Sequence, residues 1–225
     1  AELLFEDRRF GEAALEYERA AYDYPTHRRS ADAGYAALLA HAGQEKSALP
    51  DDKAARQRAS VNSALRFAAV FGSDPRVGTV LTDAAEKLFA LGEGDRASSV
   101  AQQVLALDPP AAPAQRRVAW TVAAHTAFER GDFARSETGY REAVALMPEK
   151  DPGRADLVER LAASVYKQGE QARAAGQPRE AVGHFGRVAA VAPQSAVRAT
   201  AQYDAAATLI GLKDWDGAAR TLEQF

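Results

Sequence analysis

Apolar residues recur along this chain at intervals of three and four, and a proline closes most of these runs. Phe133, Ser136, Tyr140, Ala143 and Pro148 show the pattern most clearly. Intervals of three and four keep side chains on one face of an α-helix, and proline cannot continue a helix. Alternating β-branched runs, which would indicate strands, are nearly absent. The pattern therefore predicts an all-α protein whose amphipathic helices end at prolines.

The same spacing returns along the chain, which indicates an internal repeat. A turn signal precedes several of the runs, as at Gly131-Asp132, Gly176-Gln177 and Lys213-Asp214. Another amphipathic segment lies before each turn, so each unit is expected to be a helical hairpin. The runs begin at Phe10, Ser63 (a weaker copy), Ala97, Phe133, Pro178 and Trp215.

With these residues in this order, the chain resembles the tetratricopeptide repeat (TPR) family, whose hairpins repeat about every 34 residues. The clearest match runs through Trp120, Gly131, Phe133, Tyr140 and Pro148. The resemblance covers nearly the whole chain and implies one domain, residues 1–225, folded as a right-handed α-α superhelix of about six hairpins. The expected units are 1–25, 29–75, 76–109, 112–148, 152–193 and 195–225.

The units differ in length, and the residue pattern predicts where the extra residues of the longer units lie. We expect a long loop at residues 44–52 together with a longer second helix in that unit, and a stiff linker at residues 109–113. The extra residues before Gly169 are expected to lengthen the first helix of the fifth unit. Asp74-Pro75 and Asp151-Pro152 are expected to start helices as an N-cap residue followed by proline.

Such irregular lengths resemble the bacterial cell-envelope branch of the family, which includes the outer-membrane β-barrel assembly lipoprotein and the periplasmic coordinator of the Tol–Pal system. The junctions at residues 20–37 and 192–206 carry this resemblance, through Tyr24-Pro25 and Tyr35 and through Pro193 and Tyr203. It implies the periplasm or the periplasmic face of the outer membrane, with the cytoplasm as the alternative. The chain starts and stops within helical patterns, so we expect a fragment of a longer protein.

Composition and motifs argue against several kinds of chemistry. The formal net charge is −3 and no basic run carries interleaved aromatics, so we expect no nucleic-acid partner. No apolar run approaches the roughly 20 residues that span a bilayer, so we expect no membrane insertion by this segment. The chain has no cysteine and no H-E-x-x-H pair. We therefore expect no catalytic residues, no metal site and no cofactor.

The expected working surface is the concave wall that stacked hairpins leave on one side. The resemblance assigns this wall to the first helix of each unit. Tyr35, Tyr166 and Tyr203 recur at one position of that helix, where a tyrosine can either pack on the adjoining hairpin or contact a partner. The candidate groove residues are Tyr35, Thr82, Glu86, Phe89, Thr121, His125, Phe128, Tyr166, Glu170, Arg173 and Tyr203.

These observations lead to the expectation of a noncatalytic scaffold. Its groove would hold a peptide or protein partner, extended or helical, within a bacterial envelope complex. Two alternatives stay open: a substrate-presenting or regulatory arm of a larger enzyme, and a self-assembling array that docks copies through the C-terminal edge at Phe225. An appended catalytic domain in the full-length sequence would favour the arm, and light scattering at several concentrations would test self-association.

Overall fold

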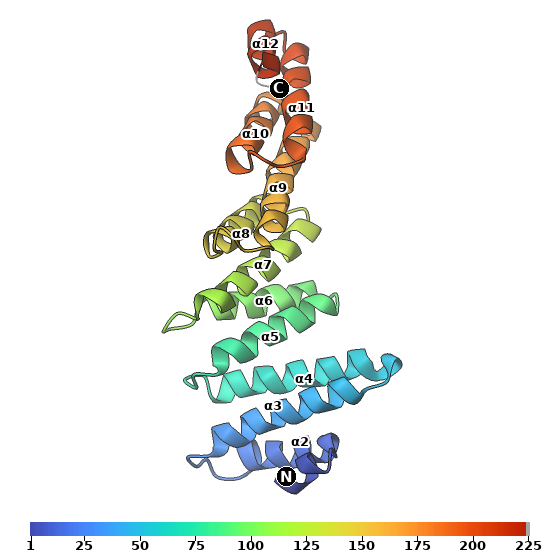
Figure 1. Cartoon of the computed structure of the whole chain (residues 1–225), viewed down its shortest axis with the longest axis vertical. Helices are drawn as coiled ribbons and strands as arrows, with labels where there is room; N and C mark the ends of the chain where they lie inside the picture. The colour runs from blue at the N-terminus through green and yellow to red at the C-terminus, as the bar shows by residue number, and fades with distance from the viewer. Residues whose placement is uncertain (224–225) are drawn as a thin grey trace. The chain divides into compact units, whose positions relative to one another are not determined.

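The computed structural model describes residues 1–223, which form α-helices with no strand among them. Twelve α-helices and one short π-helical segment, η1, follow one another along these described residues (Figure 1). The chain divides into two compact units, Ala1–Gln115 and Arg116–Phe225. The predicted all-α fold of consecutive helical hairpins is confirmed, while the prediction of a single domain stays a prediction.

Unit 1 (Ala1–Gln115) is built from helices that pack against their neighbours in chain order. Phe67, Leu88 and Val61 are among its fully buried side chains. The small number of long side chains in this core follows from the abundance of alanine at the buried positions. Its helices are α1 Glu2–Glu6, α2 Phe10–Glu18 with η1 Arg19–Asp23, α3 Ser30–Ser47, α4 Pro50–Val70, α5 Val77–Ala90 and α6 Gly94–Leu105.

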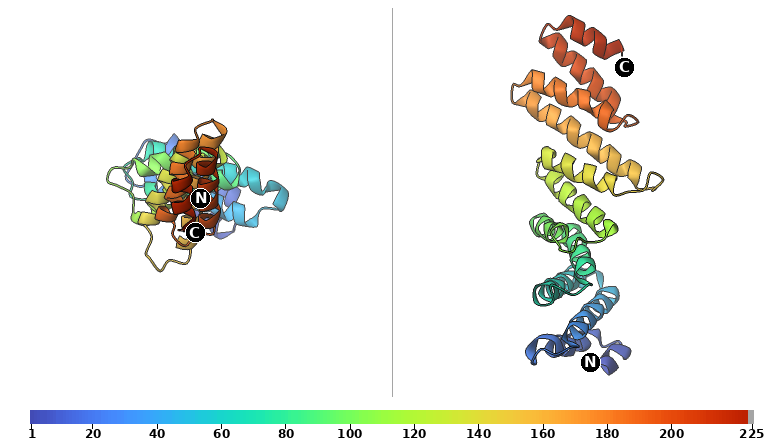
Figure 2. Two further views of the ribbon diagram at one scale, coloured as in Figure 1. Left: turned by 90° about the horizontal axis from the view of Figure 1, so that it is seen from above. Right: turned by 90° about the vertical axis from the view of Figure 1, so that its left-hand side faces the viewer.

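Unit 2 (Arg116–Phe225) holds most of α7 and the helices that follow it. Its helices from α8 to α12 pack against one another in chain order, as the right-hand view of Figure 2 shows for α9 to α12. Its core has two clusters, one around Tyr140 and one around Phe185, and Val158 and Val191 pack against both. Phe225 lies outside the described residues. The helices are α7 Pro113–Glu129, α8 Phe133–Ala145, α9 Arg154–Ala174, α10 Pro178–Val191, α11 Val197–Gly211 and α12 Trp215–Glu223.

Within the described residues, five of the six hairpin turns share one geometry, which sets the register of the repeat, while the turn between α3 and α4 has no left-handed residue. In the fifth hairpin Gly176 has a φ of 73° and donates its N–H to the Arg173 carbonyl, while Gln177 donates to the Ala172 carbonyl. This pair of bonds is a Schellman motif, which ends a helix at a left-handed residue. The five left-handed residues are Arg8, Gly92, Gly131, Gly176 and Lys213.

Small residues lie where helices of a hairpin meet. A Cβ atom on Gly139 would lie 2.9 Å from the Ala124 Cβ atom, and one on Gly169 would lie 2.5 Å from the Phe185 ring. The helices therefore approach so closely that even a methyl group at these positions would collide with a neighbour. The small position of the repeated run is buried each time, at Ala13, Ser63, Ala97, Ser136, Ala181 and Ala218.

The expected long loop at residues 44–52 is wrong. The α3 helix runs to Ser47, and α4 begins with Pro50 in its first turn. Asp51 and Asp52 follow in that turn, where carboxylates complement the positive end of the helix dipole. The polar stretch that indicated a loop thus forms the end of α3 and the start of α4. The extra residues of the second unit lengthen both of its helices. Residues 106–112 link α6 to α7, so the predicted linker at residues 109–113 is confirmed except for Pro113, which begins α7. The α9 helix is long, as predicted.

The aspartate–proline pairs start their helices differently from the prediction. The α5 and α9 helices begin two residues later than expected, at Val77 and Arg154. Asp74 accepts a hydrogen bond from the backbone N–H of Arg76, and Asp151 accepts one from that of Gly153, each at 2.9 Å. The carboxylates therefore stabilise the turn before each helix rather than capping its end.

The left-handed Lys213 gives a test of the shared turn geometry. Its φ of 61° places a side chain in a backbone region that glycine occupies without steric cost. Lys213→Gly is therefore expected to raise the free energy of unfolding by about 0.5–1 kcal/mol in urea titrations. Gly176→Ala, the matched reverse change, is expected to lower it by about as much. A lower free energy of unfolding for Lys213→Gly, or a higher one for Gly176→Ala, would contradict the assigned turn.

Candidate functional site

The recurring tyrosines divide into two that pack on neighbouring helices and one that is exposed. The Tyr35 ring lies 6.3 Å from the Phe67 ring, centre to centre, and the Arg76 guanidinium lies over it at 4.7 Å. The Tyr166 ring lies 5.3 Å from the Phe185 ring. Tyr203, in contrast, is 63% exposed. Recurrence of tyrosine at this position thus reflects packing at Tyr35 and Tyr166.

A polar bridge joins α9 to α11 in unit 2. The Tyr166 hydroxyl donates a hydrogen bond to Asp204 Oδ2 at 2.6 Å, and Arg173 Nη1 lies 3.2 Å from Asp204 Oδ1. Burial and the Asp204 carboxylate raise the pKa of Tyr166 to about 12, so the phenol stays a hydrogen-bond donor at neutral pH. Asp204 was not among the predicted site residues, because an aspartate on a helix carries no sequence signal of a partner one hairpin away.

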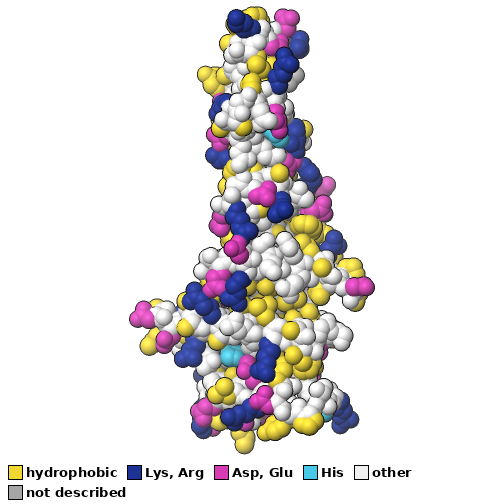
Figure 3. All heavy atoms as spheres, turned by 180° about the vertical axis from the view of Figure 1, so that it is seen from behind, with side chains coloured by type: hydrophobic (Ala, Val, Ile, Leu, Met, Phe, Trp, Pro, Cys, Tyr) yellow, Lys and Arg dark blue, Asp and Glu magenta, His cyan; other side chains and the backbone are white. Residues whose placement is uncertain are grey.

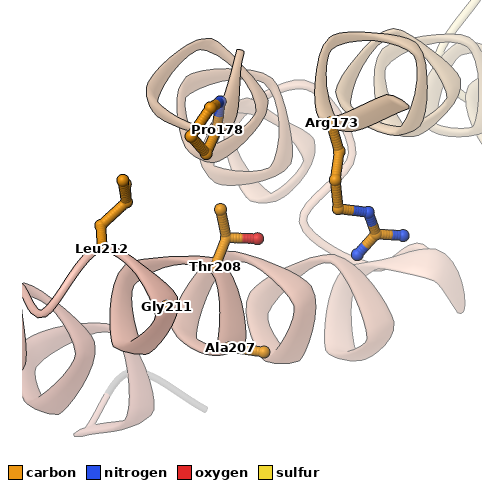
Figure 4. Close-up of a pocket in the computed structure, with 6 residues that line it drawn as sticks. All are labelled: Arg173, Pro178, Ala207, Thr208, Gly211 and Leu212. Atoms are coloured by element: carbon orange, nitrogen blue, oxygen red, sulfur yellow. The ribbon is translucent and has the colours of Figure 1, made fainter. Parts of the chain in front are cut away.

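A pocket of about 400 Å³ lies beside this bridge, between the α9–α10 turn and α11. Figure 4 shows the Arg173 side chain at one end of the pocket and Leu212 at the other. The Thr208 hydroxyl donates to the Asp204 carbonyl within its own helix at 2.6 Å. The wall is therefore apolar apart from one guanidinium. The lining residues are Arg173, Pro178, Ala207, Thr208, Gly211 and Leu212.

Glu170 and Arg173 were both predicted to line the groove. The Glu170 carboxylate pairs with Lys167 on the same helix at 2.6 Å, and both side chains are partly exposed. The Arg173 guanidinium lies 5.4 Å from the centre of the Phe185 ring while its side chain stays 44% exposed. The ring and Asp204 thus hold the guanidinium in place without enclosing it.

His125 lies inside its own hairpin. Its Nδ1 atom is 2.5 Å from the Tyr140 hydroxyl, and Tyr140 is buried. Burial lowers the pKa of His125 to about 4, and the positive charge of Arg160 acts in the same direction. The imidazole is therefore neutral at pH 7 and ties α7 to α8.

The other candidates on α7 and in unit 1 are dispersed. The Thr121 hydroxyl donates to the Arg117 carbonyl, and the Phe128 ring packs edge-on against Phe133. Thr82 is buried and donates to the Gly78 carbonyl at 2.7 Å, whereas Glu86 is exposed and Phe89 is partly buried. The structure thus brings together three of the predicted residues on α9, namely Tyr166, Glu170 and Arg173, while Tyr203 is exposed on α11.

Unit 1 has an apolar pocket of its own, which the sequence analysis did not identify. It encloses about 360 Å³ between α4, α5 and α6. Figure 3 shows hydrophobic side chains gathered on one face of this unit. The lining contains no charged side chain, so it lacks the polar anchor that Arg173 gives the pocket of unit 2. The lining residues are Leu65, Ala68, Ala69, Gly72, Val77, Leu81, Gln103 and Leu107.

Neither a metal-binding cluster nor a membrane-spanning helix is found in the described part of the chain. Within residues 1–223, no three His, Asp or Glu side chains come together in a way that could hold a metal ion. None of the helices in this range combines the length and the apolar character that crossing a bilayer requires.

Comparisons with known proteins give matches only among solved structures. No protein-family model matches the chain, and no curated protein does. A kinesin light chain from Podosopora anserina with nearly identical TPR-like repeats is 16% identical, covering 89% of this chain and 95% of that one, with a TM-score of 0.46.

Two further structures are similar at the same level. BtubC from P. vanneervenii is 17% identical, covering 97% of this chain and 88% of its own, with a TM-score of 0.39. Human IFIT1, a dimer with m7Gppp-AAAA, is 16% identical, covering 96% of this chain and 46% of its own, with a TM-score of 0.37. The assignment of a helical-hairpin fold to this chain therefore rests on the turns and the helix packing of the chain itself.

The buried His125 predicts a pH dependence of stability. Its pKa is 6.5 for a free side chain and about 4 in the fold, so below pH 6.5 the unfolded chain binds a proton that the folded chain does not. Stability is therefore expected to fall as the pH is lowered from 6.5 to about 4. His125→Gln keeps a hydrogen-bonding side chain without titrating, and urea titrations at pH 7 and 4.5 should show a smaller loss for it. An equal loss in both proteins would contradict the assignment.

Proposed function

We propose that this chain is a noncatalytic scaffold that holds a segment of a protein partner against α9 and α11. The observation that carries the proposal is the pocket of about 400 Å³ with Arg173 at one end of an otherwise apolar wall. Most small-molecule and peptide sites combine an apolar surface with a few fixed polar groups. The bridge through Asp204 fixes Arg173 before any partner arrives, which lowers the entropic cost of binding.

The lining of the pocket defines the chemistry of the segment. Ala207, Gly211 and Leu212 suit an aliphatic side chain, because they offer apolar surface and little bulk. The exposed part of the Arg173 guanidinium suits a carboxylate next to it. A segment with an aliphatic residue followed or preceded by Asp or Glu is therefore the expected ligand.

The proposed setting is a bacterial envelope complex. The junctions at residues 20–37 and 192–206 support this setting through their resemblance to envelope TPR proteins. Fractionation of cells that express the full-length protein tests it: recovery with the periplasm or the outer membrane is expected. Recovery in the cytoplasm alone would contradict the envelope setting and leave the scaffold proposal intact.

Selection from a random-peptide display library tests the pocket. Peptides enriched on the wild-type chain are expected to carry an aliphatic residue beside an acidic one. Ala207→Arg, which places a long side chain in the pocket from an exposed helix position, is expected to weaken their binding at least about ten-fold, equivalent to about 1.4 kcal/mol.

The matched control is Ala145→Arg, the same change at an exposed position of α8 outside the pocket. It should bind the selected peptides as the wild type does. Failure to enrich any peptide, or equal binding by Ala207→Arg, would contradict the proposed site.

A further inference from the structure

The Asp204 carboxylate on α11 lies between two donors from α9. Its Oδ2 atom accepts a hydrogen bond from the Tyr166 hydroxyl at 2.6 Å, and its Oδ1 atom lies 3.2 Å from Arg173 Nη1. The Tyr166 ring packs on Phe185, and the Asp204 side chain is only 17% exposed. Both carboxylate oxygens therefore have a fixed partner, and their negative charge stays beside the guanidinium.

The guanidinium of Arg173 stays accessible despite this ion pair. The Arg173 side chain is 44% exposed, and Figure 4 shows it pointing from α9 toward α11, the helix that carries Asp204. A carboxylate of a partner can therefore reach the guanidinium, but it then lies close to a second carboxylate. Like charges a few ångströms apart repel one another, and water at a protein surface reduces this repulsion without removing it.

The pocket beside Arg173 does not owe its openness to the end of the described chain. A pocket of about 380 Å³ lies against α9, one hairpin earlier, although α11 and α12 follow it. Residues at equal distances from the left-handed Gly131, Gly176 and Lys213 line both pockets. The equivalent pairs are Phe133 and Pro178, Gln171 and Thr208, and Ala175 and Leu212. The pocket is thus a feature of the repeat, and Arg173 with Asp204 gives this copy its charge.

We propose that Asp204 limits the preference of the pocket for acidic partners, an inference that rests on the proposed function. Asp204 holds Arg173 in place and also offsets part of the positive charge that a partner's carboxylate meets. The wild-type pocket therefore distinguishes Asp from Asn, or Glu from Gln, only weakly. Packing of the aliphatic residue supplies most of the binding free energy, and the carboxylate fixes the orientation of the segment.

Two synthetic peptides test this role of Asp204. One is a peptide enriched on the wild-type chain, and the other carries Asn or Gln in place of its acidic residue. The dissociation constant of the amide peptide divided by that of the acidic peptide, measured by fluorescence anisotropy, gives the charge selectivity. Asp204→Asn keeps the size of the side chain and its capacity to accept a hydrogen bond, but removes the charge. It is expected to raise the selectivity about three- to ten-fold.

Two further variants separate the charge of Asp204 from other effects. Asp156→Asn removes one carboxylate from an exposed position in the first turn of α9, at the opposite end of that helix from Arg173. Asp204→Glu keeps the charge beside the guanidinium. Both are expected to retain the wild-type selectivity. A loss of folding would weaken both peptides alike, and circular dichroism with urea titration establishes that each variant is folded.

The outcomes distinguish this role from the proposed function itself. Enrichment of no peptide, or only of peptides without an acidic residue, would contradict the proposed function and this inference with it. If acidic peptides are enriched but Asp204→Asn leaves the selectivity unchanged or lowers it, the role of Asp204 is overturned and the proposed function stands. An equal rise in Asp156→Asn or Asp204→Glu would overturn that role as well.

Discussion

Close contact between helices at small residues is the constraint on which this fold depends. At Gly169 a methyl group would lie 2.5 Å from the neighbouring Phe185 ring, and at Gly43 one would lie 2.7 Å from the Phe10 ring. Such contacts bury an aromatic ring of one helix against the backbone of the next, which stabilises a core that is otherwise mostly alanine. The left-handed turns then set the register in which aromatic and small residues meet.

The same register places polar groups where they can act between hairpins. Tyr166 packs on Phe185 and bonds Asp204 of the following hairpin, and Asp204 in turn holds Arg173 beside a pocket. Packing, interhelical bonding and the proposed binding site thus share residues. The proposed site would need little rearrangement to bind a partner, because Asp204 and the Phe185 ring already hold Arg173.

The sequence predicted the hairpins because the small residues that become buried recur at helical intervals, which the residue pattern shows directly. It failed where composition was ambiguous: the polar stretch around Ser47 and Pro50 forms helix ends instead of a loop. For the site, the pattern placed Tyr166 and Tyr203 at one helical position but could not separate packing from exposure. That difference depends on whether a following helix covers the ring, which no local pattern records.

Paired glycine substitutions test the close-contact account most directly. Gly169→Ala places a methyl group 2.5 Å from the Phe185 ring, whereas Gly183→Ala in α10 meets nothing within 4 Å. The account predicts that urea titrations show a loss of about 1–3 kcal/mol in unfolding free energy for the first variant and a gain of about 0.5–1 kcal/mol for the second. A gain for both variants would contradict it.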